Sequence, residues 1–173
     1  MKFARMLLRL VVGALFVGHG TQKLFGWFGG HGLDATSQMF EAIGARPGRL
    51  NAVAASTTET AGGALLVLGL ATPLAAAGLI ATMLTAINRV HLKNGPWNTN
   101  GGYEFNLVLI AALLALVEAD EGPGWAVASL ATGIAGAAGA HAYSAMQTEP
   151  QPSTAPAPTG APGAEREPVG AAA

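Results

Sequence analysis

The uncharged stretch TAGGALLVLGLATPLAAAGLIATMLTAIN, residues 60–88, decides the fold of this protein. The stretch is 29 residues long, and one membrane span needs only about 20 apolar residues. Pro73 resists continuing a helix but suits the first turn of a new one. We therefore predict a helix over residues 50–70, a sharp turn at 70–73, and a helix from 73 to about 90. A single long helix remains the alternative that the hydrophobic pattern alone allows.

The composition of the chain points to a membrane protein. Hydrophobic residues make up 51% of the sequence and charged residues 11%, whereas soluble domains carry about 25% charged residues. A water-facing surface cannot be covered by such a small number of charged residues. We therefore expect a large part of the surface to face lipid. The net charge is −1 without a basic stripe, and nucleic-acid binding is therefore not expected. The absence of cysteine excludes disulfides, thiolate catalysis and Cys-ligated metal centres.

Two further apolar segments give the predicted bundle four spans. The segment 4–25 begins with Arg5 and Arg9 one turn apart, and we expect their charged ends to extend to lipid headgroups. The segment 103–117 ends at three acidic residues, Glu118, Asp120 and Glu121. We therefore predict an all-α fold, an integral membrane four-helix bundle.

The first two spans are joined by a connector with an amphipathic pattern. Asp34 is a candidate N-cap, and Thr36, Met39, Phe40 and Ile43 fall on one helical face. This pattern predicts a short interfacial helix that lies on the membrane. An ordinary surface helix is the alternative.

The composition also divides the chain into three parts. Residues 1–121 form the transmembrane bundle, and residues 122–146 are a Gly/Ala-rich segment that is a candidate for an extra helix. Its small residues drive membrane insertion only weakly. Residues 147–173 are rich in Pro and Ala, and we expect a disordered C-terminal tail because no apolar face offsets the entropy of folding.

Several short motifs together resemble one known family. They are Arg9-Leu10 with Gly13, His19-Gly20, Lys23 to Gly26, Glu59 with Gly62-Gly63, Leu68 to Thr72, His91, Asn94-Gly95, and Gly101 to Glu104. In order and spacing they resemble the DoxX family of small bacterial membrane proteins over residues 5–118. The resemblance implies a multi-pass four-helix bundle in the bacterial cell (inner, plasma) membrane, which favours the hairpin at Pro73. It also implies a link to quinone-dependent oxidoreductases and to oxidative-stress defence.

Four spans of alternating direction gather the polar residues at one membrane face. The end of the first span, the start of the second, the end of the third and the start of the fourth all lie there. The side chains expected at this face are His19, Gln22, Lys23, Asn88, Arg89, His91, Lys93, Asn94, Trp97, Tyr103, Glu104 and Asn106. The opposite face has only the tight turn and the chain ends, so the polar face should carry the functional site.

Glu59 is the one ionisable residue expected well inside the apolar layer. It lies nine residues into the second span, roughly 13 Å deep at 1.5 Å per residue. A charged carboxylate there costs at least about 2.5–3.5 kcal/mol, so Glu59 should be protonated or paired with a cation from the polar face. The candidate partners are His19, Lys23 and Arg89. The functional interpretation is a proton relay or a contact to a quinone-like headgroup, and the alternative is a structural hydrogen bond between helices.

Two histidines, His19 and His91, are expected at the same membrane level. Paired histidines on separate helices could ligate haem or another metal. No spacing signature accompanies them, so two interfacial histidines that hydrogen-bond to neighbours are the favoured interpretation, and no metal site is predicted.

The leading hypothesis is a redox-associated membrane subunit that binds a lipid-soluble carrier, with quinone as the candidate cofactor. Glu59 is the candidate catalytic residue, and His19, Lys23, Arg89 and Glu104 are the candidate cofactor-binding residues. The expected partners are the lipid bilayer and a soluble redox protein. The chain lacks an obvious set of cofactor ligands, so an enzyme activity of its own is left open. A non-enzymatic membrane adaptor or assembly factor is the alternative, and a small-solute transporter ranks last because only Glu59 lies deep.

Overall fold

A computed structural model describes residues 2–147, and every regular element among them is helical. The expected tail lies outside the described residues, except for Gln147. The chain runs through α1 (Lys2–Phe25), η1 (Trp27–Gly29), α2 (Gly32–Ala42), α3 (Gly48–Leu68), α4 (Thr72–Ala86), η2 (Ile87–His91), η3 (Leu92–Asn94), η4 (Asn98–Asn100), α5 (Glu104–Glu121) and α6 (Pro123–Met146). The all-α prediction is confirmed for this part of the chain.

The hairpin between α3 and α4 is formed where the sequence predicts it. Gly69 ends α3 with a φ of 70°, and the Leu70 N–H donates to the Leu65 carbonyl at 2.9 Å. A left-handed glycine is a common end of a helix because it has no Cβ to clash. Ala71 is also left-handed, and Pro73 lies in the first turn of α4. The alternative of one long helix is therefore wrong.

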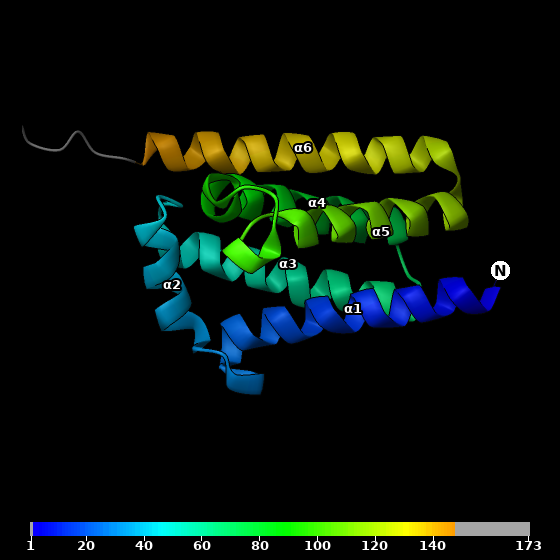
Figure 1. Ribbon diagram of the computed structural model, residues 1–173, viewed down its shortest axis with the longest axis horizontal. Coiled ribbons are helices and arrows are strands. Elements are labelled where there is room, and N and C mark those ends of the chain that lie inside the picture. The colour runs from blue at the N-terminus through cyan, green and yellow to red at the C-terminus, as the bar shows by residue number, and fades with distance from the viewer. Residues whose placement is uncertain (1, 148–173) are drawn as a thin grey trace, which may run out of the picture.

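The helices lie side by side in a bundle, with α1 and α6 at opposite edges and α3, α4 and α5 between them (Figure 1). Glycines let α1 and α3 approach closely, since a Cβ on Gly13 would lie 2.7 Å from the Gly63 carbonyl oxygen. Small residues that bring backbones together are typical of helix contacts in membranes. The shared core contains Phe16, Leu66, Leu79, Ile80, Leu113 and Leu116, all buried.

The connector between α1 and α3 contains the expected short helix, α2, which lies across one end of the bundle (Figure 1). The helix begins at Gly32, earlier than predicted, so Asp34 lies within its first turn instead of capping it. The Asp34 carboxylate pairs with Arg49 at 3.0 Å instead. An acidic side chain in the first turn still interacts favourably with the helix dipole.

The Gly/Ala-rich segment 122–146 forms the 24-residue helix α6, which packs on α4 and α5. Gly133 explains how closely α6 approaches α4, because a Cβ there would lie 2.6 Å from Ile80 Cγ2. Since α6 runs antiparallel to α5, its C-terminal end lies at the same end of the bundle as α2 (Figure 1). The extra helix therefore belongs to the bundle.

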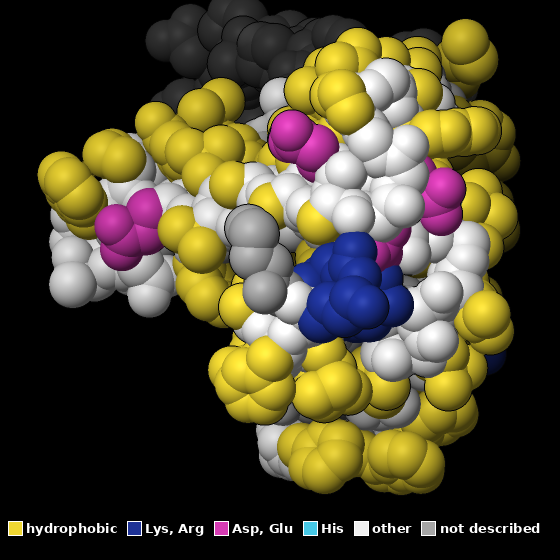
Figure 2. Space-filling model, turned by 90° about the vertical axis from the view of Figure 1, so that its right-hand side faces the viewer, with side chains coloured by type: hydrophobic (Ala, Val, Ile, Leu, Met, Phe, Trp, Pro, Cys, Tyr) yellow, Lys and Arg dark blue, Asp and Glu magenta, His cyan; other side chains and the backbone are white. Residues whose placement is uncertain are grey.

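The opposite end of the bundle holds an ion-pair cluster that the sequence did not predict. Arg9 pairs with Asp120, and Arg5 Nη1 lies 3.2 Å from the same carboxylate. Thr72 Oγ1 donates to Asp120 Oδ2 at 3.2 Å, so the carboxylate joins α1, α4 and α5. Figure 2 views this end and shows the basic side chains gathered in one patch. The Arg9 side chain is only 20% exposed because this carboxylate binds it, and its contact with lipid headgroups stays a prediction.

Two helical segments, Lys2–Phe25 and Thr72–Asn94, are long and apolar enough to cross a membrane. The outer face of α1 exposes large hydrophobic side chains, namely Phe3, Met6, Leu7, Leu10, Val11 and Leu15. An exposed apolar face of this length is consistent with contact to lipid.

Candidate functional site

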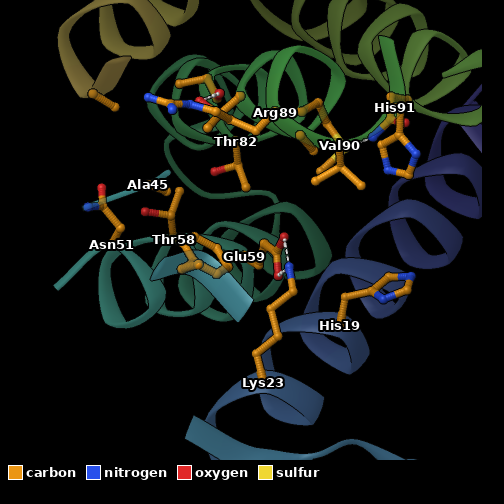
Figure 3. Close-up of a pocket in the computed structure, with 18 of the residues that line it drawn as sticks. His19, Lys23, Ala45, Asn51, Thr58, Glu59, Thr82, Arg89, Val90 and His91 are labelled. Carbon is orange, nitrogen blue, oxygen red and sulfur yellow. Dashed lines mark hydrogen bonds and ion pairs between the residues drawn. The ribbon is translucent and has the colours of Figure 1, made fainter. Parts of the chain in front are cut away.

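A buried ion pair between α1 and α3 is the centre of the candidate site. Lys23 Nζ lies 2.6 Å from both Oε1 and Oε2 of Glu59. The Glu59 side chain is 2% exposed and that of Lys23 is 28% exposed. A buried carboxylate needs a partner because desolvation of an unpaired charge is costly. Of the three cations predicted as partners, Lys23 fills this role, and it reaches Glu59 from the last turn of α1 (Figure 3).

The Lys23–Glu59 pair lies in the wall of a cavity of about 560 Å³. Side chains from all six α-helices line the cavity, and many of them are apolar, such as Phe16, Met39 and Phe105. Pockets of this size and character, mostly apolar with a few polar groups, are typical sites for small molecules and cofactors. The geometry therefore fits a lipophilic ligand that presents a polar group to the ion pair.

Four of the five residues predicted for the site line this cavity: His19, Lys23, Glu59 and Arg89. No hydrogen bond to the His19 ring is present among residues 2–147, so the ring can accept or donate one to a ligand. Arg89 lines the cavity as well, but its Nη1 donates to the Gly44 carbonyl at 2.9 Å. Arg89 thereby ties η2, which directly follows α4, to the loop that follows α2.

Glu104, the fifth predicted site residue, does not line the cavity. Its Oε1 accepts the Asn98 N–H at 2.7 Å, and Asn98 itself contributes to the cavity wall. Glu104 therefore supports the loop between α4 and α5, and its contact with a ligand stays a prediction that this structure does not favour.

The end of α4 departs from the regular helix expected to about residue 90. Residues Ile87–His91 form a π-helix, a widened turn that is often found at functional sites. It carries Arg89, Val90 and His91, which all line the cavity. His91 Nδ1 lies 2.7 Å from the Gly101 carbonyl oxygen, so His91 bonds to a neighbour as the favoured interpretation expected. In the described part of the chain, no group of three or more His, Cys, Asp or Glu side chains could hold a metal ion.

Sequence reasoning missed several residues of the cavity wall. The residues from α3 are Asn51, Ala55 and Thr58. They are spaced by four and three positions, which places them on one helical face, and this periodic spacing could have indicated them from the sequence. The contribution of α6, through Gly136, Ala140 and Ser144, gave no comparable signal because small residues in a helix do not indicate which face meets a ligand.

The fold and the site define a class: a small helical membrane protein with a mainly apolar cavity at one end of its bundle and a buried ion pair in the cavity wall. The chain belongs to the DoxX family, whose family model matches residues 4–92. This match includes α1 to α4 and the π-helix, hence His19, Lys23, Glu59 and Arg89, whereas Glu104 and α6 lie beyond it.

A curated relative supports the same assignment. It is named "Putative oxidoreductase CatD" of Bacillus subtilis (strain 168), and it is 33% identical over 111 residues, which cover 64% of this chain and 76% of the relative. No solved structure matches the chain significantly. The predicted DoxX resemblance is therefore confirmed by two independent comparisons.

Proposed function

We propose that this protein is a redox-associated subunit of the bacterial plasma membrane, crossing it several times, that binds a quinone-like carrier in the cavity described above. The observation that carries the proposal is the Lys23–Glu59 ion pair, buried in the wall of a mainly apolar cavity. The name of the Bacillus subtilis relative, "Putative oxidoreductase CatD", supports a link to redox chemistry.

The ion pair offers the groups that a quinone headgroup needs. An ammonium group has three N–H donors, and two of those of Lys23 are directed to the two Glu59 oxygens. The third can donate to a carbonyl oxygen of the ligand. Reduction of a quinone to a quinol takes up two electrons and two protons, and we assign proton transfer to the Glu59–Lys23 pair. The electrons would come from a soluble redox partner.

The test is quinone binding by the purified protein in mild detergent, with a short-chain ubiquinone as the probe. Lys23→Met should weaken binding by about tenfold or more, because a hydrogen bond to a charged donor contributes about 1.5–3 kcal/mol. Arg49→Met is the matched control, since Arg49 belongs to an exposed ion pair with Asp34. Equal affinity of the Lys23→Met variant and the control would contradict a headgroup contact at Lys23.

A second function, docking of a soluble partner as an adaptor, is favoured by the loop between α4 and α5. Hydrogen bonds from Asn94 and His91 to the Gly101 carbonyl hold this loop in shape, and it presents the Trp97 side chain 63% exposed. Exposed tryptophans are frequent anchors of protein interfaces. Trp97→Ala should then remove partner binding while leaving quinone affinity unchanged, as co-purification and the binding assay would show.

A further inference from the structure

Helix α6 supplies the wall of the cavity that lies farthest from α1. His19 and Lys23 line the cavity from α1, and Gly136, Ala140 and Ser144 line it from α6. Since α1 and α6 lie at opposite edges of the bundle (Figure 1), the cavity extends across the width of the protein. A ligand whose polar group contacts the Lys23–Glu59 pair would have to continue past that group to reach α6.

The α6 wall carries small side chains only. Residues 136, 140 and 144 are spaced by four and so share one helical face, which carries glycine, alanine and serine. Large side chains line the cavity from α1 and α5, namely Phe16 and Phe105, whereas α3 and α4 also contribute small residues such as Ala55 and Ala81. The small face of α6 thus forms the cavity wall on this side.

Packing between helices favours a small residue at both Gly133 and Gly136, more strictly at Gly133. A Cβ on Gly133 would lie 2.6 Å from Ile80 Cγ2, whereas the nearest atom to a Cβ on Gly136 would be Ala81 Cβ at 3.2 Å. The start of α6 is also held by Ser129, whose hydroxyl donates to the Pro73 carbonyl at 3.1 Å. The approach of α6 to α4 is thus closest at Gly133 and somewhat less close at Gly136, where α6 reaches the cavity.

We propose that the small face of α6, through Gly136 and Ala140, sets the size of ligand that the cavity admits. The ligand class that fits is a ring-bearing lipophile with an apolar substituent that extends from the Lys23–Glu59 pair to α6. This inference rests on the proposed function and adds that α6 selects ligands by their size. The wall lies outside the segment that matches the family model.

The first test needs no quinone. The chain has no cysteine, so Thr82→Cys places a single thiol in the cavity wall (Figure 3). The rates at which this thiol reacts with N-ethylmaleimide and with the larger N-phenylmaleimide measure how much free space the cavity has beside residue 82. Ala140→Leu should slow the reaction with the phenyl reagent by about tenfold, and more than the reaction with the ethyl reagent, because overpacking excludes the larger ring. Ala142→Leu is the matched control on the same helix, at an exposed position. Gly136→Ala provides a second, milder narrowing should Ala140→Leu fail to fold.

The second test measures affinity for a tail-free ubiquinone and for a ubiquinone with one isoprene unit. Ala140→Leu should weaken binding of the tailed compound about tenfold and affect the tail-free compound less. Unchanged reaction rates and unchanged affinities in Ala140→Leu would overturn the role of α6. A wild-type protein that binds neither quinone while Ala140→Leu still slows the phenyl reagent would instead reject quinone as the carrier and keep α6 as the wall.

Discussion

The Lys23–Glu59 pair allows a prediction about stability because its two side chains are buried to different degrees. Glu59 is 2% exposed and Lys23 is 28% exposed. Removing the cation with Lys23→Met leaves a carboxylate without a partner in the protein interior. Breaking a fully buried pair costs about 3–5 kcal/mol. The carboxyl can take up a proton, which limits the penalty, so we expect a loss of about 2–3 kcal/mol.

Glu59→Gln is expected to cost less, about 1 kcal/mol. The glutamine keeps the shape of the side chain and can still accept a hydrogen bond, and the partly exposed Lys23 can reach water at the polar end. In the double variant Lys23→Met/Glu59→Gln no charge remains buried. Its loss should therefore be smaller than the sum of the two single losses, with a coupling of about 1–2 kcal/mol.

The assay is thermal unfolding in detergent, in which size-exclusion chromatography measures the fraction of protein that stays folded after heating. At about 2–4 °C per kcal/mol for a chain of this size, Lys23→Met should lower Tm by about 4–12 °C. Asp34→Asn is the control, because it breaks the exposed pair with Arg49 and should cost under about 0.5 kcal/mol. Strictly additive losses, or a Lys23→Met variant as stable as the wild type, would refute the argument that Lys23 compensates a buried charge.

Activity separates the structural role of Glu59 from its proposed chemical role. If Glu59 transfers a proton, Glu59→Gln should fold but fail to complement an oxidant-sensitive deletion strain, because an amide cannot ionise. Glu59→Leu should also destabilise the fold, by about 1–3 kcal/mol for the partner left unsatisfied. A membrane-expression blot controls for protein amount, and full complementation by both variants would exclude proton transfer at Glu59.

The other predictions concern packing, the second ion-pair cluster and topology. Gly13→Ala should destabilise the contact of α1 with α3 by about 1–3 kcal/mol, whereas Gly18→Ala on the same helix, where a Cβ meets no atom within 4 Å, should not; equal unfolding temperatures would contradict this. Arg9→Met and Asp120→Asn should each lower stability by about 1–3 kcal/mol, and the double variant should lose less than their sum because the two side chains form one pair. Single cysteines in α2 and in η4 should react with an impermeant maleimide from the same side of the membrane, and labelling from opposite sides would contradict two spans joined by the hairpin at Pro73.

The sequence alone indicated most of the course of the chain through the bundle, with the hairpin at Pro73 favoured over one long helix. An uncharged run too long for one span, with Pro73 in its middle, predicted the turn between α3 and α4 that the structure contains. Alternating helix direction then predicted that polar residues from distant segments meet at one end. The depth of Glu59 along its helix predicted that a cation must reach it. These predictions depend on hydrophobicity, helix length and backbone restrictions, which are local properties.

The tertiary structure decided which of the gathered residues touch one another. Lys23, Arg89 and His19 were equal candidates for Glu59, yet Arg89 bonds to the Gly44 carbonyl and only Lys23 reaches the carboxylate. The pairing of Arg9 with Asp120, far apart in sequence, and the contribution of α6 to the cavity had no signal in the chain. Such contacts depend on how each helix is rotated about its axis and how closely it approaches its neighbours, as glycines allow for α1 and α3. Both quantities arise only when the helices pack together, because periodicity gives the face of a helix without naming the residue it meets.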